Sequence, residues 1–136
     1  MVNIPNRKKR WRGFTLIELM IVISIILILV SISIPIYTTS VVHSKEAVLK
    51  DDLFTMRSVI DQYTLDKQKA PQSLQDLVSA GYLRSIPKDP LTGTADSWQT
   101  TSDDTIMDPN QSQPGITDVH SGASGVSTEG TAYSSW

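Results

Sequence analysis

The sequence has no cysteine, only two histidines, and no basic residue after Lys88. Without cysteine, no disulfide can stabilise a domain that works outside the cytoplasm. The residues after Lys88 include seven acidic ones: Asp89, Asp96, Asp103, Asp104, Asp108, Asp118 and Glu129. This imbalance argues against a general nucleic-acid surface, which needs clustered lysine and arginine.

Charge is also missing between Leu19 and Val42, where the chain is almost entirely apolar. A membrane helix needs about 20 such residues to cross a hydrocarbon core of about 30 Å. Five basic residues precede the run and favour a cytoplasmic N-terminus: Arg7, Lys8, Lys9, Arg10 and Arg12. We therefore expect a single span, with everything after about residue 42 exported. Subtracting the five leader charges from the net charge of −2 leaves −7 for residues 14–136.

Two simpler interpretations of this span fit less well. A secretory signal peptide has a shorter apolar region and a small-residue cleavage site, whereas residues 33–37 form a poor site of that kind. A plain signal anchor fits the hydropathy but gives Glu18 no role. A carboxylate inside a membrane helix costs about 2.5–3.5 kcal/mol on insertion scales, so it is a functional candidate.

Cleavage between Gly13 and Phe14 would give Glu18 a partner. It would create an α-amine on Phe14, and Glu18 would lie in the first helical turn, where the helix dipole favours negative charge. The carboxylate could then pair with the Phe14 amine of a neighbouring subunit. Pairing reduces the penalty of burying either charge alone.

The string Gly13-Phe14-Thr15-Leu16-Ile17-Glu18-Leu19, with its basic leader and apolar run, resembles the type IV pilin and pseudopilin superfamily. The resemblance implies that prepilin peptidase cleaves after Gly13, that Phe14 is N-methylated, and that Glu18 sets the register of a filament. Pro35 matches the family's helix proline, where a kink is expected. Since proline removes a backbone donor, the carbonyl of Ser31 needs another partner, to which the Ser31 and Ser33 hydroxyls could contribute. Alternatively, Pro35 only marks the outer end of the span.

The exported part is predicted to be a compact head of class α+β, with a pilin-like long helix on a small antiparallel sheet. We assign residues 1–13 to a cleaved leader, 14–42 to the membrane and filament-core helix, and 43–136 to the head. An apolar stripe extends the helix through 43–66: Val42, Leu49, Leu53, Met56, Ile60 and Tyr63. A short helix and loop cover 73–97, with Ser73 as N-cap and Gly81 at the close. The sheet and C-terminal loop cover 98–136, with Trp98 in the core and candidate strands at 98–101, 105–107 and 116–120.

The Gly-Ser-Thr-rich stretch 121–131 has the composition of a disordered segment, but Tyr133 and Trp136 follow it and could anchor it. Residues 83–90 and 116–136 are similar to the major pseudopilin of the type II secretion system. In that family the C-terminal loop binds calcium, which holds together a sheet with little core. Asp118, Ser121, Ser124 and Glu129 are the candidate ligands here. Ser124 and Ala132-Tyr133 replace carboxylates of the family, and calcium prefers six to eight oxygen ligands including carboxylates.

Catalysis has little support in the sequence. Asp118, His120 and Ser121 have the residue types of a hydrolytic triad, but a triad is recognised by geometry and neighbours on one strand rarely provide it. His120 is expected to be structural and His43 solvated. We therefore predict that the protein is not an enzyme.

The predicted function is that of a pseudopilus subunit in type II secretion, driving protein export across the outer membrane. The resemblance implies an inner-membrane, single-pass protein with a periplasmic head, extracted into a helical homo-oligomeric filament. Its implied partners are prepilin peptidase, an inner-membrane assembly platform and minor pseudopilins, with no nucleic acid. Two alternatives stay open. One is a type IV pilin for adhesion, motility or DNA uptake, and the other is a single-pass anchored binding domain with an uncleaved leader.

Overall fold

The computed structural model describes residues 13–103 and 114–136 of the chain. It contains one long helix, α1 (Leu16–Lys67), a short helix, α2 (Leu74–Ser79), two strands, β1 (Gln99–Ser102) and β2 (Ile116–His120), and a 3-10 turn, η1 (Tyr133–Ser135). The chain divides into two compact units, residues 1–39 and 40–136, and α1 contributes to both. Predicted features within residues 1–12, and the candidate strand at 105–107, lie outside the described residues.

The first unit contains the apolar part of α1, and its side chains are exposed along the whole run. The most apolar window of α1 has a mean hydropathy of 3.0, so the helix is long and apolar enough to cross a membrane. Serine hydroxyls within the run donate to carbonyls one turn earlier, Ser24 to Met20 and Ser33 to Leu29. This local bonding satisfies the hydroxyls in a setting without water.

Helix α1 continues through Pro35 rather than ending there. The hydroxyls of Thr38 and Thr39 both donate to the Pro35 carbonyl, at 2.9 and 3.0 Å. Ser33, expected to help satisfy the Ser31 carbonyl, donates to Leu29 instead. The kink at Pro35 remains a prediction.

In the second unit, the remainder of α1 packs against the head through one apolar stripe, formed by Leu49, Leu53, Met56, Ile60 and Tyr63, all buried. Intervals of three and four residues place these side chains on one face of a helix. Complete burial of one such side chain contributes about 1.5–3 kcal/mol. The prediction was wrong for Val42, which is 38% exposed. The C-terminal loop makes its first described side-chain contact with α1 one turn later, at Glu46.

Residues 68–98, between α1 and the sheet, contain the short helix α2, which is capped at both ends. Ser73 is the N-cap of α2, as predicted, and it forms a capping box with Asp76, each side chain bonding the other's backbone N–H. Gly81 follows α2 with a φ of +84°, a conformation that favours glycine. Leu77 of α2 is completely buried in the core, and Trp98 donates from its indole N–H to the Pro87 carbonyl at 2.8 Å.

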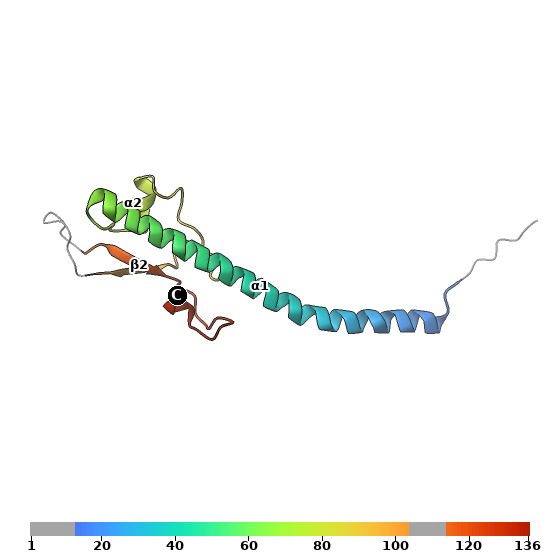
Figure 1. Ribbon diagram of the computed structural model, residues 1–136. Coiled ribbons are helices and arrows are strands. Elements are labelled where there is room, and N and C mark those ends of the chain that lie inside the picture. Colours follow the sequence, from blue (N-terminus) through green and yellow to red (C-terminus); the bar gives the residue numbers. More distant parts are fainter. Residues whose placement is uncertain (1–12, 104–113) are drawn as a thin grey trace, which may run out of the picture. The chain divides into compact units, whose positions relative to one another are not determined.

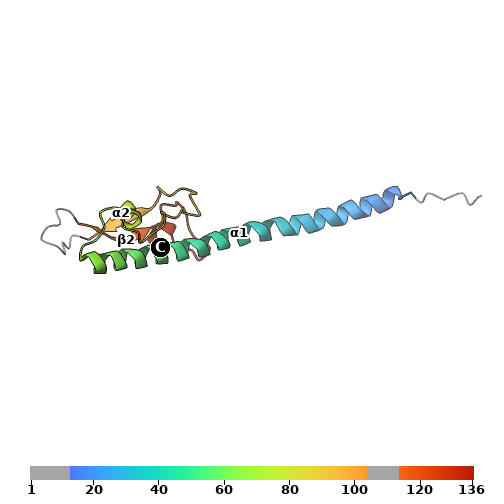
Figure 2. The same ribbon diagram turned by 90° about the horizontal axis from the view of Figure 1, so that it is seen from above.

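Strands β1 and β2 form a two-stranded antiparallel sheet, with Gln99 opposite His120 and Thr100 opposite Val119. An irregularity between Thr101 and Ser102 shifts the register. Ile116 and Val119 of β2 face the core, whereas β1 is exposed along its length. Figures 1 and 2 show the sheet and the C-terminal segment alongside the green part of α1. The layout is the predicted α+β, pilin-like one, with β2 at the predicted residues and β1 one residue later than predicted.

Candidate functional site

The start of α1 is capped by Thr15, a residue that the sequence analysis left without a role. Its hydroxyl accepts the backbone N–H of Glu18 at 3.2 Å, and its carbonyl accepts that of Leu19. This is the first half of the Thr-x-x-Glu capping signature, which the sequence displays openly. The cap places Glu18 in the first helical turn, where a negative charge interacts favourably with the helix dipole.

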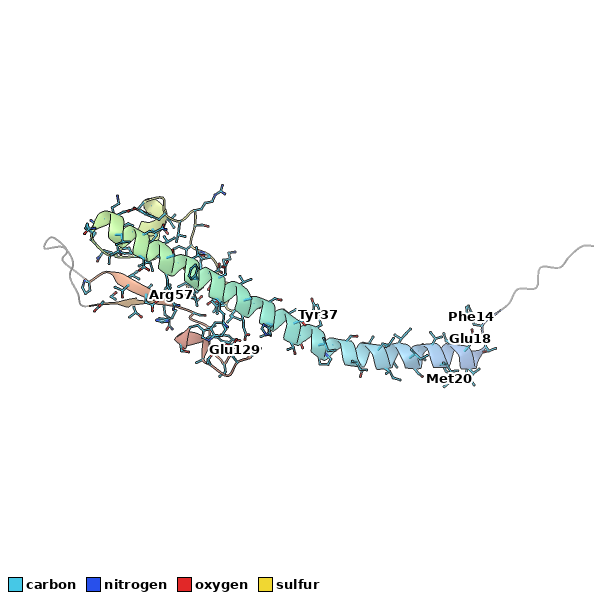
Figure 3. The ribbon with its side chains drawn as sticks, in the orientation of Figure 1. Phe14, Glu18, Met20, Tyr37, Arg57 and Glu129 are labelled. Carbon is cyan, nitrogen blue, oxygen red and sulfur yellow. The ribbon has the colours of Figure 1, made fainter. Side chains whose placement is uncertain are left out.

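Phe14 and Glu18 lie together at this end of the helix (Figure 3). With Leu19 and Val22 they line one shallow hollow on the helix surface. Phe14 is 85% exposed, and a Cβ added at Gly13 would meet nothing within 4 Å. The Gly13–Phe14 bond therefore precedes the helix in an open segment, the kind of site at which a peptidase can act.

The apolar surface that follows this bond has no partner within the described chain. Leu16, Ile17 and Leu27 are each more than 60% exposed, and the side chains between them are also open. A soluble monomer rarely exposes apolar surface on this scale, so such a face marks a membrane or protein contact. Glu18 is the only carboxylate in this part of the helix. The structure thus presents an apolar rod with one acidic group at its first turn.

Three of the four candidate calcium ligands are engaged with different partners. Asp118 accepts from Arg57 Nε at 2.6 Å, Ser121 donates to buried Asp89, and Glu129 pairs with Lys50 Nζ at 3.0 Å. Ser124 is exposed. Within residues 13–103 and 114–136, no three His, Cys, Asp or Glu side chains gather in a metal-binding group. Both carboxylates of the set therefore have a basic side chain of the protein as partner, and calcium binding stays a prediction.

Asp118 belongs instead to an ionic cluster around Arg57. The guanidinium Nη2 also donates to the carbonyls of Val119 and Trp136, at 2.9 and 2.8 Å. Burial alone would raise the pKa of Asp118, but the Val119 N–H and the Arg57 guanidinium stabilise the carboxylate and lower its pKa. Arg57 therefore joins α1 to β2 and to the end of the C-terminal segment.

Glu46, like Thr15, was given no role by the sequence motifs. It lies at 3% exposure, and its carboxylate accepts from the Thr128 N–H and the Tyr133 hydroxyl, both at 2.8 Å, and from the Thr128 hydroxyl. The Thr128 hydroxyl contributes most to a lowered pKa for Glu46, which burial opposes and the remaining donors and His43 reinforce. Glu46 lies three residues before Leu49 and so on the face of the apolar stripe. This position was the sequence signal that its carboxylate would be buried.

Tyr133 and Trp136 anchor the C-terminal segment, as predicted. Tyr133 is buried, and the Trp136 indole donates to the Thr131 hydroxyl while its ring lies 4.5 Å from Lys50 Nζ. An isolated bridge between Val126 and Ala132 closes the intervening loop. A Gly-Ser-Thr-rich segment is therefore ordered by contacts at its two ends.

The described residues do not form a triad. Both ring nitrogens of His120 are engaged, Nδ1 with the Trp136 carbonyl at 2.7 Å and Nε2 with Asp118 at 3.5 Å. The Ser121 hydroxyl donates to Asp89, not to the imidazole. His43 is exposed, as predicted. His120 therefore has the structural role expected of it.

Known proteins match this chain over the segment that contains the Gly13–Phe14 bond and the first turn of α1. Residues 8–34 match the family model described as the prokaryotic N-terminal methylation motif. The type II secretion system core protein G of Klebsiella pneumoniae is 35% identical over 98 residues, 60% of this chain and 70% of the relative. That of Klebsiella michiganensis is 32% identical over 103 residues, 64% of this chain and 72% of the relative. The chain belongs to this core protein G family.

Pilins proper are also similar to this chain. The type IV major fimbrial protein FimA of Dichelobacter nodosus is 35% identical over 104 residues, 76% of this chain and 59% of the relative. No solved structure has significant similarity to the chain. The relatives are structural pilins and pseudopilins, and the apolar helix is consistent with membrane anchoring.

Proposed function

We propose that this protein is the structural subunit of a type II secretion pseudopilus, a filament that drives protein export across the outer membrane. One observation carries the proposal: the acidic first turn of an exposed apolar helix directly follows an open Gly13–Phe14 bond. Membership in the core protein G family supports it. The role is structural rather than enzymatic.

Maturation begins with insertion, the basic leader remaining in the cytoplasm. Prepilin peptidase hydrolyses the Gly13–Phe14 bond, leaving a carboxylate on Gly13 and an amine on Phe14. Methyl transfer to that nitrogen from a sulfonium donor, which leaves as the neutral thioether, replaces one hydrogen, released as a proton. The methylated amine still takes up a proton and carries positive charge. The mature chain then has opposite charges at its terminus and at Glu18, on one side of the first turn.

Assembly pairs these charges between subunits. Glu18 of one subunit meets the Phe14 amine of its neighbour, and the pair is buried among apolar helices, which reduces the cost of leaving each charge alone. A head-to-tail contact whose rotation does not close a ring generates an open helical fibre. The filament grows from the inner membrane, with heads in the periplasm, on an assembly platform and with minor pseudopilins.

N-terminal mass spectrometry of the protein extracted from membranes tests this proposal. We expect a chain beginning with methylated Phe14. An intact leader on the membrane-embedded protein would overturn the proposal and favour the single-pass anchored domain. As a matched control, a Gly13→Leu variant should keep its leader, and because Gly13 lies outside the helix and touches nothing, its head should still fold.

The similarity to FimA supports a second candidate, a type IV pilin. The two functions differ in where the filament goes and what its loss does. Deletion of the gene should abolish export of a secreted protein if the subunit belongs to a pseudopilus. Long surface fibres built of this subunit, with export intact in the deletion strain, would assign it to a type IV pilus.

A further inference from the structure

The contacts of the C-terminal loop with α1 centre on a buried anion. Both oxygens of the Glu46 carboxylate are occupied, by the N–H and hydroxyl of Thr128 and by the hydroxyl of Tyr133. All three groups are donors, so this part of the loop turns positive dipoles toward α1. A cation needs the opposite arrangement, with oxygen lone pairs pointing inward.

The turn between Ser127 and Thr131 also uses its own acceptors. The Ser127 carbonyl accepts from the Gly130 N–H at 3.0 Å, and the Thr131 carbonyl accepts from the Ser127 N–H at 2.7 Å. The Ser127 hydroxyl oxygen accepts from the N–H groups of Glu129 and Thr131. Backbone carbonyls and hydroxyls are common calcium ligands in loops, and in this turn these are already bonded.

Two more residues of α1 hold the same segment. Lys50 pairs with Glu129 and lies against the face of the Trp136 ring, and Arg57 bonds Asp118 and the Trp136 carbonyl. Glu46, Lys50 and Arg57 are separated by four and seven residues, which places them on one side of the helix. Glu46 contacts the segment at Thr128, Lys50 at Glu129 and Trp136, and Arg57 at Trp136.

We infer that α1 itself fastens the C-terminal loop, chiefly through the buried Glu46 carboxylate, and that the head of this protein folds without calcium. This departs from the calcium-bound loop implied by the family resemblance. The inference concerns the head and goes beyond the proposed function, so it stands or falls separately from filament assembly. Hydrogen bonds from Thr128 and Tyr133 to the Glu46 carboxylate hold this loop in place, whereas in a calcium-bound loop the oxygens of the loop are held by the cation.

Amide hydrogen exchange on the full chain in detergent tests the inference, since it measures how often a loop opens. For the wild type, exchange of the Thr128 amide should be the same within about twofold in excess EGTA and in millimolar calcium. In Glu46→Ala it should accelerate at least about tenfold in both buffers, because three buried donors lose their acceptor. Asp61→Asn, which removes an exposed carboxylate from the same helix, should leave exchange unchanged.

A milder variant covers the case in which Glu46→Ala does not fold. Tyr133→Phe keeps the buried ring and removes one donor, so loop exchange should accelerate by about threefold, again without regard to calcium. The inference is overturned if EGTA accelerates wild-type loop exchange tenfold or more. It is equally overturned if both variants exchange like the wild type.

Discussion

Gly122 occupies a position where no side chain fits. A Cβ built there would lie 1.8 Å from the Ser97 carbonyl oxygen, a distance that only a backbone shift could relieve. The residue before it, Ser121, is fully buried and bonded to Asp89, so the shift would disturb that contact. We expect Gly122→Ala to lower the free energy of unfolding by about 1–3 kcal/mol, as overpacking does. Urea unfolding of the full chain in detergent measures it.

Ser124→Ala, two residues further along the same loop, is the matched control. Ser124 is exposed, and surface substitutions usually change stability by less than about 0.5 kcal/mol. Equal unfolding free energies for Gly122→Ala and the wild type would show that the segment around Ser97 yields without cost.

Arg57 offers a second test at this scale, because its role depends on shape as much as on charge. Its guanidinium bonds Asp118 and two backbone carbonyls, those of Val119 and Trp136. Lysine keeps the charge but lacks the planar fork that reaches several acceptors. We expect Arg57→Lys to cost about 1–2 kcal/mol in urea unfolding, since some acceptors lose their donor.

The control for Arg57→Lys is Arg84→Lys, an exposed arginine outside the sheet, which should be neutral. If the two variants unfold alike, the charge of Arg57 rather than its geometry holds β2.

At the scale of elements, the connection between α1 and the C-terminal loop should depend on pH. The folded-state pKa of Glu46 is lowered, chiefly by the Thr128 hydroxyl, so its contribution is complete above the unfolded value of about 4.3. That contribution is lost as pH falls through the folded pKa. When the pH is lowered below about 4.3, we expect the urea midpoint of the wild type to decrease more steeply than that of Glu46→Gln.

Other carboxylates also titrate in this range, so the effect of Glu46 is measured as the difference in stability between the wild type and Glu46→Gln. The groups that act on Glu46, namely Thr128, Tyr133 and His43, are common to both proteins. The stability gap should be largest near neutral pH and should close on acidification. A gap that stays constant down to pH values below the folded pKa would contradict an ionised Glu46.

The elements that could be predicted from the sequence are those encoded by residues that lie close together in the chain. The stripe of α1 from Leu49 to Tyr63, the N-cap at Ser73 and strand β2 depend on residues close in sequence, and the structure confirms them. The Glu46–Thr128 and Lys50–Glu129 contacts join residues 82 and 79 positions apart. No local pattern specifies such pairs, nor the Arg57–Asp118 pair, whose residues are 61 positions apart. The sequence therefore could not show that Asp118 and Glu129 each bond a basic side chain of the protein.

At the scale of the whole molecule, one carboxylate on an apolar rod is predicted to control assembly. Glu18 lies in the first turn of α1, capped by Thr15, and no cationic side chain of the described structure pairs with it. In a filament its proposed partner is the Phe14 amine of the next subunit. Removing one member of a buried ion pair costs about 3–5 kcal/mol, because the other charge stays buried alone.

We therefore expect Glu18→Ala to be processed to Phe14 like the wild type but to form few or no filaments, since each added subunit would bury an unpaired amine. Mass spectrometry reports the processing, and electron microscopy of sheared fibres reports the assembly. Ser24→Ala, in the same apolar run, should assemble normally, because the Ser24 hydroxyl bonds the carbonyl of its own helix at Met20. Normal filaments from Glu18→Ala would show that the apolar helices find their register without the charge pair, whereas an uncleaved Glu18→Ala chain would assign the carboxylate to peptidase recognition instead.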